Sequence, residues 1–133
     1  MAKMNNEETK LMLFFQEATG AAIRDIVDDG ENVAFVVADG EMGRAIGQGG
    51  RNISLLQKRL KRNIVLVEWS EELERFVSNI FFPTKVNVTV EGDSIRVAAT
   101  PEDRKYVIGR GGYRIKLART LVERNFRKMD VRA

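Results

Sequence analysis

The glycine-rich stretch I-G-Q-G-G at residues 46–50 occurs again as I-G-R-G-G at residues 108–112, 62 positions further along the chain. Aligned with this shift and without a gap, the two halves keep apolar residues at matching positions. The matched pairs include Leu11 with Leu73, Phe14 with Phe76, Phe35 with Val97, Ile53 with Ile115 and Leu60 with Val122. Because a solenoid stacks at least three shorter units, a repeat of this length that occurs twice indicates two small domains. We therefore expect a polar lead-in at 1–7, one domain at 8–69 and a second domain at 70–133.

Hydrophobic spacing predicts the same order of elements in each half, namely helix, strand, strand, helix, helix, strand. The first helix is expected to end at Gly20, and its counterpart in the second half is expected to begin after Ser70 as the N-cap. The predicted strands are 22–28, 32–38, 64–69, 85–90, 94–99 and 128–131, and the later helices are 41–46, 51–62, 102–108 and 113–124. Asn63 and Asn125 are expected to end the long helices in the left-handed conformation.

The composition excludes many kinds of catalytic site, because the chain has no His and no Cys. It therefore has no catalytic imidazole, no thiolate nucleophile and no zinc finger. The longest apolar run, residues 33–38, is far shorter than the ~20 residues that a membrane-spanning helix needs, and residues 1–6 lack the apolar core of a secretory signal. We expect a soluble, cytoplasmic protein that is not an enzyme, with no metal, no cofactor, no membrane association and no small-molecule substrate.

Charge is segregated along the chain, although the net charge is only +3. Residues 41–67 contain 6 basic and 1 acidic side chains, and residues 104–133 contain 10 and 2. Residues 1–40 and 68–103 each contain 3 basic and 8 acidic side chains. Lysine and arginine often serve only to solvate the polar face of a helix. Two basic segments at the same place in both halves nevertheless favour contact with a polyanion.

The two glycine stretches share the pattern G-x-x-G between two predicted helices. A tight turn needs one or two glycines for positive φ, whereas three glycines in four residues also leave a surface without Cβ atoms that another backbone can approach. Each stretch leads into a longer helix, whose free N–H groups and dipole favour a phosphate. A P-loop would continue with Lys after its last glycine, whereas Arg51 and Tyr113 follow here, and a dinucleotide fingerprint would need a glycine in place of Asn52.

An α-β-β-α-α-β unit with I-G-x-G-G between its second and third helices resembles the type II KH domain. Two such units resemble the KH pair of the NusA family of transcription termination and antitermination factors, including its short archaeal members. The resemblance spans about residues 8–131 and implies two tandem type II KH domains of the α+β class, each a three-stranded mixed sheet with helices on one face. It also implies binding of single-stranded RNA, a nascent transcript, with each loop clamping about four nucleotides of backbone. We expect no counterpart in this chain of the polymerase-binding and OB-fold domains of bacterial NusA, which leaves contact with RNA polymerase open.

The resemblance places the RNA-binding residues at the glycine stretches and in the helices that follow them. These residues are Gly47, Gln48, Gly49, Gly50, Arg51, Lys58 and Arg62 in the first half, and Gly109, Arg110, Gly111, Gly112, Tyr113, Arg114 and Lys116 in the second. Because Arg110 is cationic and Gln48 is neutral, we expect the second site to bind phosphate more strongly.

For six positions, one of which (Tyr113) is also among the predicted RNA-binding residues, the sequence leaves the role of the side chain open. Ile46, Ile53, Ile108 and Ile115 either line a base groove or belong to the core, and their helical spacing favours the core. Tyr113 could stack on a base, whereas Trp69 at the end of an apolar strand is expected to pack between the two halves.

Two other functions remain compatible with the sequence. The chain could be a scaffold whose KH folds dock polymerase or ribosomal proteins and touch RNA only incidentally. It could also be a ribosome-associated KH protein that binds structured rRNA. Hydrolytic and redox catalysis are disfavoured by the missing His, Cys and P-loop.

Overall fold

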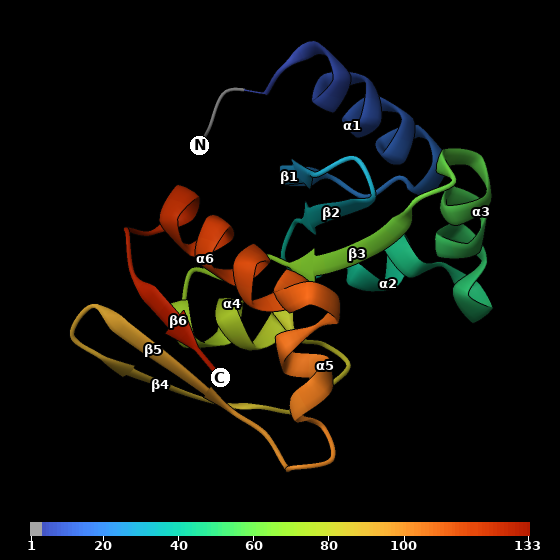
Figure 1. The fold of residues 1–133 in the computed structure, drawn as a ribbon. Helices are drawn as coiled ribbons and strands as arrows, with labels where there is room; N and C mark the ends of the chain where they lie inside the picture. The colour runs from blue at the N-terminus through green and yellow to red at the C-terminus, as the bar shows by residue number, and fades with distance from the viewer. Residues whose placement is uncertain (1–3) are drawn as a thin grey trace. The chain divides into compact units, whose positions relative to one another are not determined.

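The computed structural model describes residues 4–133, which form two compact units. The first unit ends at Trp69 and the second begins at Ser70. The first contains α1 (Asn6–Thr19), β1 (Ile23–Asp28), β2 (Asn32–Val37), α2 (Met42–Ile46), the 3-10 turn η1 (Gln48–Gly50), α3 (Arg51–Leu60) and β3 (Asn63–Glu68). The second contains α4 (Leu73–Ile80), β4 (Asn87–Glu91), β5 (Ser94–Ala98), α5 (Arg104–Ile108), η2 (Arg110–Gly112), α6 (Tyr113–Asn125) and β6 (Asp130–Arg132) (Figure 1). The order predicted from the sequence is confirmed in both halves.

Each unit has a three-stranded mixed sheet with the second strand in the centre. In the first unit, β2 pairs antiparallel with β1 and parallel with β3, so that Phe35 lies between Ile26 and Leu66. In the second unit, β5 pairs antiparallel with β4 and parallel with β6. A parallel pair requires a crossover connection, and here the crossover consists of two helices with a glycine stretch between them. The topology therefore places each glycine stretch at a corner of the crossover, outside the sheet.

The core of the first unit lies between one face of its sheet and its three helices. Phe15 of α1 stacks on Phe35 of β2, with ring centroids 4.4 Å apart. Leu11, Ala45 and Leu56 bring α1, α2 and α3 into the same apolar cluster. Burial of a Phe or Leu side chain stabilises a fold by roughly 1.5–3 kcal/mol, so these contacts fix the helices that flank the glycine stretch.

The second unit has the same arrangement, but its central strand β5 differs from β2 in its pattern of burial. Its α4 contributes the buried residues Phe76, Val77 and Ile80, and α4 packs on β4 and α6. Along β5, Ile95 and Val97 are buried while Arg96 and Ala98 are exposed. This alternation is typical of a strand with one covered face. By contrast, residues 33–37 of β2 are buried without interruption.

The first helices differ from the sequence predictions at their N-termini. Asn5 caps α1 in a capping box with Glu8, so residues 6 and 7 of the expected lead-in are helical, and residues 1–3 of that lead-in lie outside the described residues. The prediction that Ser70 is an N-cap is wrong: α4 begins at Leu73 after Glu72, and the Ser70 hydroxyl accepts the N–H of Glu72 at 3.2 Å. A serine followed by two glutamates also suits a local turn before the helix.

The predicted left-handed helix ends at Asn63 and Asn125 are also wrong. Lys61, with φ 55°, takes that conformation after α3, and Asn63 is already in β3. Asn125 is still helical, and its side-chain amide donates to the Leu121 carbonyl at 2.9 Å. The cause is a difference in length, because α3 has 10 residues and α6 has 13. Beyond the long helix, the ungapped alignment no longer pairs equivalent positions.

Candidate nucleic-acid interface

The two glycine stretches have nearly identical backbones. We call Gly47–Gly50 the first glycine loop and Gly109–Gly112 the second. The torsions (φ, ψ) are 77°, 166° at Gly47, 64°, 22° at Gly49 and 75°, 18° at Gly50; they are 79°, 168° at Gly109, 63°, 21° at Gly111 and 77°, 15° at Gly112. In each loop the N–H of the last glycine donates to the carbonyl of the first at 3.1 Å. All six glycines have the positive φ that L side chains rarely adopt.

The first glycine of each loop is required by packing. A Cβ atom on Gly47 would lie 2.8 Å from the side-chain Cγ of Asn52, and one on Gly109 would lie 2.7 Å from the backbone N of Arg114. Both distances are shorter than a real carbon contact, so a side chain at either position would displace the start of the following helix. These glycines therefore close the turn and leave no room for a side chain.

The third residue of each loop has the opposite surroundings. A Cβ atom on Gly49 or on Gly111 would meet nothing within 4 Å. Both residues are exposed, as are the variable residues Gln48 and Arg110 beside them. The loops thus present bare main chain to solvent at these two positions, which is the surface predicted from the three glycines.

Each loop ends at the N-terminus of a helix whose amides are not capped by a side chain. The N-cap residues of α3 and α6 are Gly50 and Gly112, neither helix has a side-chain cap hydrogen bond, and neither has an acidic residue in its first turn. The N–H groups of Arg51 and Tyr113 donate to the carbonyls of Gln48 and Arg110 in the preceding 3-10 turns. The following N–H groups of a first helical turn, together with the helix dipole, favour an anion. By contrast, α1 has Glu7 and Glu8 in its first turn and Asn5 as its cap.

Exposed cations surround these helix ends. Arg110 adjoins the bare Gly111, Arg51 follows Gly50 as the first residue of α3, Lys116 lies in the first turn of α6, and Lys58 lies further along α3. Among residues 4–133, none of these four forms an ion pair. Their charges are therefore available to an external anion.

Two other predicted RNA-binding arginines have partners within the protein. Arg62 forms an ion pair with Asp28 at 2.8 Å, joining the end of α3 to the β1–β2 turn. Arg114 donates from its guanidinium to the carbonyl of Ile80 at 2.9 Å, joining α6 to the end of α4. Burial lowers the pKa of the Arg114 guanidinium, an effect that neighbouring Tyr113 opposes. Both side chains hold elements together, whatever further role they have.

The apolar and aromatic candidates lie mostly within the protein. Ile115 is buried, and Ile46 and Ile53 pack partly buried against the core cluster of the first unit, while Ile108 is half-buried. The hydroxyl oxygen of Tyr113 is buried. The guanidinium carbon of Arg24 lies 4.3 Å from the centroid of the Trp69 ring, so one face of that ring is covered by a cation.

Sequence reasoning missed an exposed pair beside the second loop. Lys105 and Tyr106 are exposed on α5, and the Lys105 ammonium lies 5.1 Å from the centroid of the Tyr106 ring. Tyr106 is 56% exposed, which is unusual for so large a side chain. A lysine and an aromatic residue one position before I-G-R-G-G, with only Val107 between, are a signal that the sequence contained, because aromatic rings stack on bases.

The structure shows neither a metal centre nor a membrane span in its described part. Across residues 4–133, the acidic side chains form no group of three or more that could hold a metal ion. Within the same range, no helix combines the length and the apolar character needed to cross a bilayer.

Comparison with known proteins finds a KH domain in the first half of the chain and relatives along nearly all of it. The KH domain family matches residues 11–71, which include the first glycine loop. A Halobacterium salinarum protein named probable transcription termination protein NusA is 37% identical, over 97% of this chain and 96% of that protein. A Halococcus morrhuae protein of the same name is 39% identical, over 88% of this chain and 87% of that protein.

A solved structure has the same fold. The crystal structure of APE1850 is 34% identical in sequence and superposes with a TM-score of 0.75, covering 96% of this chain and 98% of that chain. The match therefore extends over both units.

Proposed function

The chain belongs to the family of archaeal proteins named probable transcription termination protein NusA, and from this premise we propose that it binds single-stranded RNA at two sites. The main support is the pair of bare glycines, Gly49 and Gly111, each beside an uncapped helix N-terminus. Main chain that no side chain covers lets the sugar–phosphate backbone approach closely, and free amides at a helix start bind its phosphates.

We assign both units as type II KH domains in tandem, the first at 8–69 and the second at 70–133. The family match supports the first. The second is supported by the same element order, the same mixed sheet and loop torsions within a few degrees of the first.

In this proposal each loop holds the RNA backbone while neighbouring cations neutralise phosphates. Arg51 and Lys58 serve the first loop, and Arg110 and Lys116 serve the second. Phosphate contacts position the strand, whereas contacts to base edges give sequence preference. Arg110 adds a charge that Gln48 lacks, so the second loop binds a phosphate more strongly. Two linked sites raise the overall affinity when one strand spans both.

The RNA is a nascent transcript, and the protein acts in the cytoplasm on termination or antitermination of transcription. The names of its relatives support the termination role. RNA polymerase is a candidate partner, because a termination factor acts on a transcript while the enzyme is still elongating it. RNA binding requires no catalytic group, so the proposed role is not enzymatic.

Paired aspartates in the loops test this function. In the first loop the variant is Gln48→Asp with Gly49→Asp, and in the second it is Arg110→Asp with Gly111→Asp. Asp tolerates positive φ better than most residues, so the loops keep their shape while repelling phosphate. Binding of a fluorescent oligouridine is measured by anisotropy at several salt concentrations. We expect weaker binding in both variants and the larger loss at the second loop.

Charge-matched controls place the same change elsewhere. Asn6→Asp with Leu13→Asp matches the first variant, and Arg75→Asp with Phe82→Asp matches the second; all four positions are exposed. These controls should retain most of the affinity. A folded chain with all four loop substitutions that still binds RNA as tightly as its controls would instead support a scaffold that docks proteins.

A further inference from the structure

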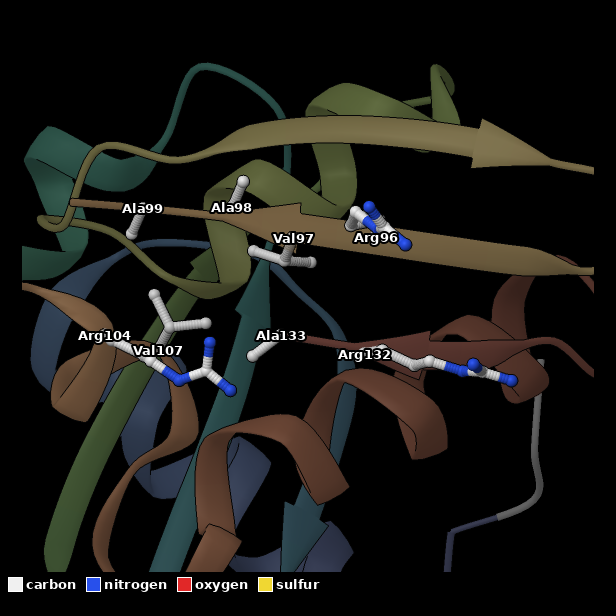
Figure 2. Close-up of a pocket in the computed structure, with 8 residues that line it drawn as sticks. All are labelled: Arg96, Val97, Ala98, Ala99, Arg104, Val107, Arg132 and Ala133. Carbon is white, nitrogen blue, oxygen red and sulfur yellow. The ribbon is translucent and has the colours of Figure 1, made fainter. Parts of the chain in front are cut away.

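A cavity of about 280 Å³ opens in the second unit, where the end of β5, the start of α5 and the end of β6 meet (Figure 2). Three of its eight lining residues are arginines, namely Arg96, Arg104 and Arg132, and no lining side chain is acidic. We call these three residues the arginine pocket. Each arginine comes from a different element; in Figure 2, Val97 lies between Arg104 and Arg96, and Val107 lies beside Arg104.

The sheet register forces two of these charges together. Arg96 and Arg132 are directly opposite each other on the parallel strands β5 and β6, and both side chains are exposed. Like charges at directly opposite positions destabilise a sheet. Arg132 forms an ion pair with Asp130, but Arg96 and Arg104 form none with any residue in 4–133. A bound anion would relieve this repulsion.

The fold does not require arginine at these positions. By the repeat, Arg96 corresponds to Ala34 and Arg104 to Met42. Arg132 pairs with Arg96, and Val65 pairs with Ala34. The strand register therefore makes Val65 the equivalent of Arg132. The first unit thus has the same strand register with no charge at any of the three positions; there Ala34 and Val65 are buried, whereas Arg96 and Arg132 are exposed.

The arginine pocket is connected to the second glycine loop by one short helix. Arg104 is the first residue of α5, and Gly109 follows its last residue. Five residues of α-helix span about 7.5 Å, so a single extended strand can contact both places. Guanidinium groups bind phosphate well because their planar donors match its oxygens. Of the aliphatic lining residues, Val97 and Val107 are buried, and Ala98 is exposed and offers an apolar contact to a ribose or a base.

We propose that the arginine pocket binds a phosphate-bearing nucleotide of the same RNA strand that the second glycine loop holds. The inference rests on the proposed RNA-binding function and extends it, because the contacted segment of RNA is then longer in the second unit than in the first. The first unit, with Ala34, Met42 and Val65 at the matching places, contacts only the nucleotides at its loop.

The test is made in the full chain with the first loop disabled by Gln48→Asp and Gly49→Asp, so that the second unit carries the binding. The pocket variant adds Arg96→Gln with Arg104→Gln to this background. The control variant, which has the same net charge, adds Lys10→Gln with Arg75→Gln instead. Affinities for oligouridines of four and eight nucleotides are measured by anisotropy over a range of salt concentrations, and circular dichroism checks that each variant is folded.

We expect the pocket variant to bind the octamer more weakly than the control does and to bind the tetramer equally well. Because each phosphate neutralised on a single strand contributes ~0.7 to the slope of log K against log salt, the slope for the octamer should fall by ~1.4. An octamer affinity and slope equal to those of the control would overturn the pocket while leaving the loop function in place. Failure of the unmodified chain to bind either RNA would overturn both.

Discussion

Gly47 lies so close to Asn52 that a Cβ atom on the glycine would be 2.8 Å from the Asn52 Cγ. The Asn52 amide also donates to the carbonyl of Arg44 at 2.9 Å and so joins the end of α2 to the start of α3. The first glycine loop is therefore closed from within by a side chain that occupies the space beside its first residue. Two residues further on, at Gly49, the same loop is open to solvent.

This difference predicts unequal effects of alanine at the two glycines. Gly47→Ala should lower the free energy of unfolding by about 3 kcal/mol, because its torsions are almost exclusive to glycine and the new methyl collides with Asn52. Gly49→Ala has only the cost of the left-handed conformation, roughly 1–2 kcal/mol. Urea denaturation followed by circular dichroism measures both values. Equal losses would contradict the division of roles.

Arg114 and Lys116 should separate stability from RNA binding. Arg114→Gln removes a charged hydrogen bond to the Ile80 carbonyl and should lower the free energy of unfolding by about 1.5–3 kcal/mol. Lys116→Gln changes an exposed side chain and should alter stability by less than about 0.5 kcal/mol. In RNA titrations, Lys116→Gln should reduce the salt dependence. If it leaves that dependence unchanged, Lys116 does not contact phosphate.

Substitution of the variable residue of each loop by that of the other should weaken RNA binding at the second loop and strengthen it at the first. Arg110→Gln should lower the slope of log K against log salt by ~0.7, and Gln48→Arg should raise it by a similar amount. Both changes keep the loop glycines, so the thermal midpoint should not move. Anisotropy titrations at four salt concentrations would measure the slopes. A loss of stability in either variant would show that the exposed residue supports the loop.

The pair formed by Arg62 and Asp28 should contribute to stability. These side chains are 30% and 17% exposed, so the pair is only partly screened by solvent. A double-mutant cycle with Arg62→Gln and Asp28→Asn should give a coupling energy of about 1 kcal/mol or less. Lys58→Gln, one turn earlier on α3, should show no coupling to Asp28 and should weaken RNA binding more than Arg62→Gln does.

The features predicted well from the sequence are those that depend on local pattern. The order of elements follows from apolar spacing, and the bare surface at Gly49 and Gly111 follows from three glycines in four residues. The partner of Arg114 could not be predicted in this way, because Ile80 is 34 positions distant in the chain. Its carbonyl becomes an acceptor only when α4 and α6 pack together.

The sequence also could not predict which residues after α3 and after α6 are structurally equivalent. The shift of 62 positions pairs Asn63 with Asn125, yet Asn63 begins a strand and Asn125 is still helical. Apolar spacing continues smoothly past the point where α3 stops, so nothing local marks the additional turn of α6. The correspondence between Val65 and Arg132, which reveals the arginine pocket, appears only in the strand register.

The near-identity of the two loop backbones has a consequence for how such a protein can change over time. Gln48 and Arg110 are held on equivalent frameworks although one is neutral and the other charged. A substitution at either position can therefore alter the affinity of the loop for a ligand without lowering the stability of the fold. After duplication of such a unit, the phosphate affinity of each loop can change independently through substitution of a single residue.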